Sequence, residues 1–206
     1  MGRNSSMDQQ IEDIMDVEWE MFSTANNNGG KAECQNQPDT FRIMRKSQFS
    51  VWTSEIRDSY FMDLKQAKKD GRNLCAEKYG YMMESTFPEE YEGIKDMLPA
   101  IDKAKMEQIR RIVQINLEWE QEMDEKYKKL RANGRPLKKE QDTQYATSVE
   151  TYMTGELKTY SEKTIQLLYD HTIGCKENGR NLAYEILTNM VIAYGYGSVE
   201  EAEAQI

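Results

Sequence analysis

Apolar residues recur at every third or fourth position along most of the chain, which is the spacing of one face of an α-helix. A first helix is predicted over about residues 8–24. Ile11, Ile14 and Glu18 share its inward face. The asparagines and glycines of residues 26–30 then favour a turn. No segment shows the apolar–polar alternation of a β-strand, so the pattern predicts an all-α fold.

Three longer stripes predict three long, uninterrupted helices. They span about residues 39–70, about residues 102–131, and the stretch from between Thr143 and Ser148 to Gly179. Shorter helices are predicted after Asn73, over about residues 86–99, after Asn181 and after Ser198. Asparagine, serine and threonine are favoured at helix N-termini because their side chains accept hydrogen bonds from free backbone amides.

Two motifs occur twice and in the same order along the chain. Glu18-Trp19-Glu20 returns as Glu118-Trp119-Glu120, and Gly71-Arg72-Asn73-Leu74 returns as Gly179-Arg180-Asn181-Leu182. We interpret these matches as an internal duplication within one helical domain that spans residues 1–206. The predicted architecture is a helical bundle of two similar helical-hairpin units, about residues 8–85 and 102–195, packed about a pseudo-twofold axis.

The Gly-Arg-Asn-Leu corner has a structural explanation for three of its four residues. The glycine ends one helix, the asparagine caps the next and the leucine packs. Capping does not explain Arg72, and its planar guanidinium suits a carboxylate of the following helix or a ligand. The duplication predicts that Asn73 superposes on Asn181 and that Trp19 superposes on Trp119.

Polar residues lie among the apolar positions of the inward stripes. Glu18 shares an apolar face, and Glu120 lies nearest the stripe in the second copy of its motif. A carboxylate that faces a core needs an arginine, a metal or a hydrogen-bond network, because burying a bare charge is costly. The alternative is a solvated flank beside a buried tryptophan.

Further polar residues on or beside the stripes are expected to converge between the two units. They are Arg45, Gln48, Tyr60, Asp63, Tyr152, Glu156 and Tyr160. The alternative is a core edge at which tyrosines and amides find local partners.

The composition excludes several classes of protein. The formal charge of −9, from 27 basic and 36 acidic residues, argues against binding to a nucleic-acid backbone. No apolar run is as long as a membrane span and no signal peptide opens the chain, which predicts a soluble, cytoplasmic protein without membrane partners. The three cysteines have no Cys-x-x-Cys spacing, so neither a disulfide framework nor a zinc site is predicted.

Catalytic chemistry has few candidates. The single histidine, His171, disfavours a helical di-iron site, and no metal site is predicted, although oxygen ligands alone suit magnesium or manganese. Cys34 follows two glycines in a loop and is a candidate nucleophile that we expect to be more accessible than Cys75 and Cys175. No motif identifies a cofactor. The basic stretch of residues 126–139, which includes Arg135, suits an anion, an acidic partner or simply a helix C-terminus.

Several motifs together resemble an uncharacterised bacterial family, the domain of unknown function 4125. They are Glu18-Trp19-Glu20, Cys34-Gln35, residues 44–49, Gly71-Arg72-Asn73-Leu74 and residues 81–86. The similarity extends over nearly the whole chain, including residues 151–161. The resemblance implies a bacterial protein and marks candidate residues, but it implies no activity.

The leading functional hypothesis is a pocket between the units that binds a small polar or charged molecule, with or without catalysis. Arg45 and Arg72 would hold an anionic group, tyrosines and tryptophans would form the walls, and Glu18 or Glu156 would act as a base if burial raises its pKa. The alternative is a non-catalytic scaffold for protein partners, with an exposed apolar patch and no cavity. The sequence does not define an oligomeric state.

Overall fold

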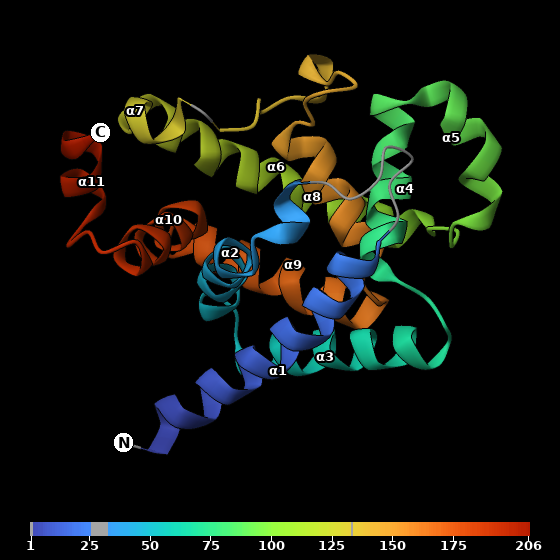
Figure 1. Cartoon of the computed structure of the whole chain (residues 1–206), viewed down its shortest axis with the longest axis horizontal. Coiled ribbons are helices and arrows are strands. Elements are labelled where there is room, and N and C mark those ends of the chain that lie inside the picture. Colours follow the sequence, from blue (N-terminus) through green and yellow to red (C-terminus); the bar gives the residue numbers. More distant parts are fainter. Residues whose placement is uncertain (1, 26–32, 133) are drawn as a thin grey trace.

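The computed structural model describes residues 2–25, 33–132 and 134–206, and the side chains of 6–25, 35–132 and 134–206. Within these residues the regular structure is helical and no strand forms, which confirms the all-α prediction (Figure 1). The α-helices are α1 (Gly2–Thr24), α2 (Pro38–Ser50), α3 (Ser54–Lys69), α4 (Leu74–Thr86), α5 (Pro88–Ile94), α6 (Lys103–Lys126), α7 (Lys128–Arg131), α8 (Val149–Lys158), α9 (Glu162–Glu177), α10 (Leu182–Ala193) and α11 (Val199–Gln205). Short 3-10 turns are η1 (Glu33–Asn36), η2 (Lys95–Met97) and η3 (Lys139–Gln141).

The prediction of three uninterrupted long helices was wrong. The first stripe divides into α2 and α3, and the third divides into α8 and α9. Thr53 starts α3 by accepting a hydrogen bond from the Ile56 amide, and Ser161 starts α9 by accepting one from the Thr164 amide. The second stripe breaks at Tyr127, between α6 and α7. The apolar spacing continues across these breaks, so the caps were hidden inside apparently continuous stripes.

Both Gly-Arg-Asn-Leu corners have the geometry that their residue types predicted. Gly71 and Gly179 each have φ of +69°, the left-handed conformation that favours glycine. Asn73 accepts a hydrogen bond from the Ala76 amide at the start of α4. Asn181 accepts one from Tyr184 at the start of α10. Each corner therefore reverses the chain between two helices and fixes where the second one begins.

The helices form two sets that pack across each other. α1 contacts α2, α3 and α4, while α6 contacts α8, α9 and α10. Between the sets, α4 packs against α8, α10 packs against α2, and α3 packs against α9, as the ribbon shows (Figure 1). A single apolar core runs through both sets, with fully buried side chains that include Ile11, Ile14, Phe49, Ile109, Ile115 and Ile165.

The crossing of α4 and α8 requires a glycine. A Cβ atom on Gly155 would lie 2.9 Å from Met82 Cγ and 3.0 Å from the Lys78 carbonyl oxygen. Those distances are shorter than ordinary van der Waals contact, and one of the two neighbours is backbone. Gly155 therefore lets α8 approach α4 closely enough for their side chains to meet.

Adding a methyl group at this crossing is expected to destabilise the protein. Gly155→Ala should lower the free energy of unfolding by about 1–3 kcal/mol through overpacking, despite the better helix propensity of alanine. The matched control is Gly174→Ala in α9, where no atom lies within 4 Å of the added Cβ. This control should raise stability by roughly 0.5–1 kcal/mol. Urea denaturation measures both, and the same sign for the two variants would contradict the prediction.

Candidate functional site

A cavity of about 220 Å³ lies where α1, α2, α3 and α4 face α8. One part of its wall is apolar and is formed by Phe22, Phe41, Met44, Leu64 and Leu74. The other part is charged and polar, and is formed by Glu18, Arg45, Tyr60, Lys78, Tyr152 and Glu156. Pockets that bind small molecules in helical proteins commonly combine apolar walls with a few convergent polar groups.

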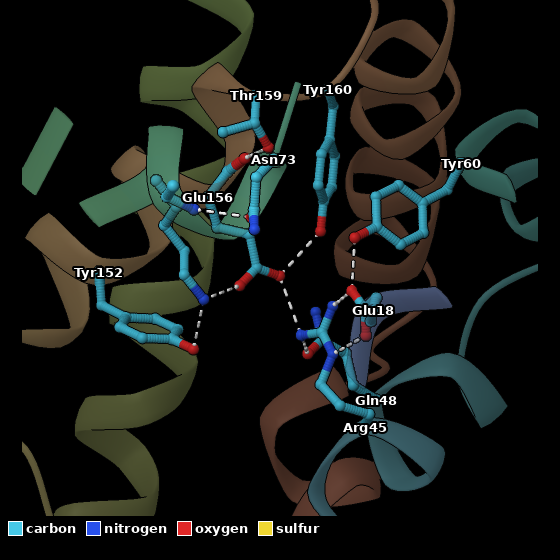
Figure 2. Close-up of polar contacts among 11 residues, drawn as sticks. Glu18, Arg45, Gln48, Tyr60, Asn73, Tyr152, Glu156, Thr159 and Tyr160 are labelled. Carbon is cyan, nitrogen blue, oxygen red and sulfur yellow. Dashed lines mark hydrogen bonds and ion pairs between the residues drawn. The ribbon is translucent and has the colours of Figure 1, made fainter. Parts of the chain in front are cut away.

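Arg45 is the centre of the polar wall. Its Nε donates to Glu18 Oε2 at 2.7 Å and its Nη2 donates to Glu18 Oε1, which makes a two-pronged ion pair. Its Nη1 donates to Gln48 Oε1 at 2.7 Å and to Glu156 Oε1 at 3.0 Å. Figure 2 shows the guanidinium between the two carboxylates. Glu18 and Glu156 come from different helix sets, so this one side chain joins them.

A tyrosine hydroxyl binds each of the two carboxylates. Tyr60 donates to Glu18 Oε1, and Tyr160 donates to Glu156 Oε1 at 2.8 Å (Figure 2). The two rings pack against each other with their centres 4.5 Å apart. Burial, and next the negative charge of the glutamate that each hydroxyl binds, raise the pKa of Tyr60 and Tyr160 well above the ordinary value. Both hydroxyls therefore stay protonated and act as donors.

Lys78 of α4 completes the network, and sequence reasoning missed it. Its buried Nζ donates to the Tyr152 hydroxyl at 2.9 Å and to Glu156 Oε2 at 3.4 Å. A signal was present, because Lys78 follows Leu74 by four residues and precedes Met82 by four, which places all three on one helix face. A lysine at such a spacing is expected to be buried with a partner.

The ionisable groups of this network are stabilised in their charged forms, which does not suit them to proton transfer. Burial alone would raise the pKa of Glu156, but the charges of Arg45 and Lys78 and the Tyr160 hydroxyl lower it to about 2. Glu156 is therefore ionised at neutral pH, opposite to the raised pKa that a catalytic base would need. Burial opposes the charged form of Lys78, yet Tyr152 and Glu156 raise its pKa, so it remains a cation.

Six of the predicted ligand-binding and catalytic candidates meet at the site, namely Glu18, Arg45, Gln48, Tyr60, Glu156 and Tyr160. All six are connected through Arg45 and the two glutamates. Tyr152 joins them through Lys78. The sequence interpretation therefore identified most of the polar wall, although it did not predict which groups pair.

Three other candidates, an arginine and two tryptophans, lie outside the cavity. Arg72 is bound to Glu77 through two hydrogen bonds of 2.7 Å at the chain reversal, away from the cavity. Trp19 packs on Phe22 and Phe41 with ring centres 5.7 and 5.1 Å apart, behind the apolar wall. Trp119 is buried in the core around α6.

The other two candidates are an acid and a thiol. Glu120 forms an ion pair of 2.5 Å with Arg131, outside the cavity wall. The side chain of Cys34 lies outside the described part of the chain, so its predicted accessibility stays a prediction. A different cysteine, Cys75, lines the cavity, and burial raises the pKa of its thiol to about 11. A thiol with that pKa is protonated at neutral pH and is a poor nucleophile.

Arg135 lies on the segment between α7 and α8 and also lines the cavity. Its Cζ is 4.5 Å from the centre of the Tyr152 ring, and its Nη1 donates to the Thr147 carbonyl at 3.1 Å. It is exposed to solvent, whereas the side chain of Arg45 is only 11% exposed. It therefore forms the outer, solvent-facing end of the polar wall.

The comparison with protein families is informative at this point. The family described as a protein of unknown function (DUF4125) matches residues 8–204. The chain belongs to this family. The match includes every residue of the polar wall, from Glu18 to Glu156. No curated protein and no solved structure is detectably similar to the chain.

The described residues contain no group of three or more histidine, cysteine, aspartate or glutamate side chains placed to hold a metal ion. No helix within the same part of the chain is long and apolar enough to cross a membrane.

Proposed function

We propose that this DUF4125 protein binds a small organic molecule in the cavity beside Arg45. The observation that carries the proposal is a cavity of about 220 Å³ between an apolar wall and a charged wall in which Arg45 and Lys78 pair with the two glutamates. The pairing supports binding rather than proton-transfer chemistry, because Arg45, Lys78 and Glu156 are held in their charged forms. The free thiols of Cys75 and Cys175 support a cytoplasmic location, since reducing compartments keep cysteines unpaired.

The cavity volume limits the size of the ligand. An apolar cavity of about 150 Å³ accepts a benzene molecule, so about 220 Å³ suits a single ring with one small substituent. The alternative of an interaction scaffold predicts inward polar residues that satisfy one another and leave no cavity. The polar residues are mutually bonded here, but the cavity remains beside them, which favours a ligand.

We also infer that the two helix sets are copies of one unit. Support comes from the matching corners and from pairs of side chains at matching places. Gln10 bonds Asp58 between α1 and α3, as Gln108 bonds Gln166 between α6 and α9. Glu20 and Lys68 form an ion pair, and Glu118 and Lys176 do the same.

These pairs align the first helices differently from the tryptophan motif. They place Glu20 of α1 opposite Glu118 of α6, so Met21 corresponds to Trp119. Burial follows the same alignment, because Met21 and Trp119 are both buried while Trp19 is only half-buried. The Glu-Trp-Glu matches are therefore two residues out of the alignment that the side-chain contacts support.

Filling the mouth of the cavity tests the proposal. Met44 lines the cavity yet is 50% exposed, so Met44→Trp should block entry without disturbing the core. The matched control is Met62→Trp on α3, at a position that is 62% exposed and away from the cavity. We expect single-ring compounds, screened by ligand-observed NMR, to bind the wild type and Met62→Trp alike. Met44→Trp should bind these compounds at least about tenfold more weakly than the wild type does.

Two results would count against a ligand in this cavity. One is a panel in which no single-ring compound binds the wild type at millimolar concentration. The other is equal binding to Met44→Trp and to the wild type, which would place the bound compounds at another surface.

A further inference from the structure

The charges around the cavity do not balance. Among the described residues, three cationic side chains line it, Arg45, Lys78 and Arg135, against two anionic ones, Glu18 and Glu156. Arg45 and Lys78 have those glutamates as ion-pair partners. Arg135 has no carboxylate partner within the part of the chain that the structure describes. Among the described residues, the wall therefore has one positive charge that its acids do not neutralise.

Arg135 is held in place rather than left to swing in solvent. Its guanidinium stacks on the Tyr152 ring and bonds the Thr147 carbonyl. The next residues are tied to the start of α8, because the Val149 amide donates to the Pro136 carbonyl at 2.8 Å. An arginine fixed in this way loses little side-chain entropy when it binds an anion.

Two of these cations, one paired and one without a carboxylate partner, converge on one aromatic ring. Lys78 Nζ lies 4.4 Å from the centre of the Tyr152 ring, and Arg135 Cζ lies 4.5 Å from it. Like charges brought together beside a ring repel each other, and an anion bound next to them lowers that energy. The polar end of the cavity is thus arranged for negative charge near Tyr152.

We propose that the ligand is a monoanion, a carboxylate on a single apolar ring, with its carboxylate bound by Arg135 beside Tyr152 and its ring against the apolar wall. This inference rests on the proposed function and adds the chemical class of the ligand. The wall's excess of one positive charge matches one carboxylate. Arginine binds a carboxylate through two parallel hydrogen bonds, which also fixes the orientation of the ring.

The experiment compares benzoate with its neutral isostere benzamide by titration calorimetry at low salt. The proteins are the wild type, Arg135→Gln and the matched control Arg110→Gln, which removes an exposed arginine of α6 from outside this cavity. We expect the wild type to bind benzoate more tightly than benzamide. Arg135→Gln should weaken benzoate about tenfold or more and leave benzamide unchanged, while Arg110→Gln should change neither.

The outcomes distinguish ligand binding in the cavity from the anionic class of the ligand. Benzamide binding as tightly as benzoate, or benzoate binding that survives Arg135→Gln, overturns the anionic class and leaves the cavity function standing. Failure of both compounds to bind the wild type overturns both the ligand binding and the anionic class. Because Arg135 is exposed, its contribution should also shrink as ionic strength rises, and benzoate affinity that is independent of salt would contradict its role.

Discussion

Replacing Arg45 with methionine is expected to lower the free energy of unfolding by about 3–5 kcal/mol. Methionine keeps the apolar part of the side chain but leaves Glu18 without its cation and leaves Glu156 with Lys78 as its only cation among the described residues. Both carboxylates are at least nine-tenths buried, so water cannot replace the lost hydrogen bonds without opening the structure. Urea denaturation, followed by the circular dichroism of the helices, measures the loss.

Arg42 is the matched control, since it lies one turn earlier on α2 and also binds two acids, Glu12 and Asp16. Its side chain is 40% exposed, so Arg42→Met should cost about 0–1 kcal/mol. Adding Glu18→Gln to the Arg45→Met variant should recover part of the loss, because a neutral amide needs no cation. A loss for Arg45→Met no larger than that for Arg42→Met would show that the buried network does not stabilise the fold.

Acid should remove a specific part of the stability. The pKa of Glu156 in the folded protein is lowered to about 2 from an ordinary 4.5, so the unfolded chain takes up this proton first as pH falls. The stabilisation is therefore complete above about pH 5 and is lost between about pH 4.5 and pH 2. The ionised Glu156 contributes roughly 3 kcal/mol to the free energy of unfolding at neutral pH. Stability measured against pH in urea gives the profile.

The profile of Glu156→Gln distinguishes this group from other acids. The variant is less stable at neutral pH, since Lys78 loses an anionic partner, but its stability should fall less steeply between pH 4.5 and pH 2. Glu118→Gln removes a carboxylate that pairs with Lys176 at the surface, and its profile should follow the wild type. Parallel profiles for the wild type and Glu156→Gln would mean that Arg45 and Lys78 do not hold this carboxylate ionised.

The sequence was informative about the polar wall because buried polar residues stand out among apolar ones. Glu18, Tyr60 and Glu156 occupy positions where helical spacing requires a side chain to face inward, and a polar residue there needs partners. The spacing says nothing about which partners they find. Arg45 lies beside its stripe, and only the folded arrangement, which brings Glu18 of α1 and Glu156 of α8 to its guanidinium, decides that it pairs with both glutamates.

Other features could not be read from periodicity. The breaks before Thr53 and Ser161 were hidden because the apolar spacing continues through them. Arg135 lies in a connector, where no period indicates direction, and its basic neighbours suggested a helix terminus instead. Under the duplication that we propose, the Glu-Trp-Glu motifs differ in register from the alignment that the side-chain pairs support, because a repeated tripeptide reports only the identity of its residues.

The two contacts between the helix sets have a consequence for how such a site arises. Gly71 and Gly179 are separated by the same number of residues as Lys78 and Ile186, and as Gln48 and Glu156. The α4–α8 contact therefore has a lysine and a glutamate at the positions where the α10–α2 contact has an isoleucine and a glutamine. A homodimer of half-length chains would carry identical residues at both contacts and would have to bury the charged pair twice. Under the proposed duplication, one continuous chain allows each contact to change separately, so the proposed ligand site can form at one contact while the other holds the two helix sets together.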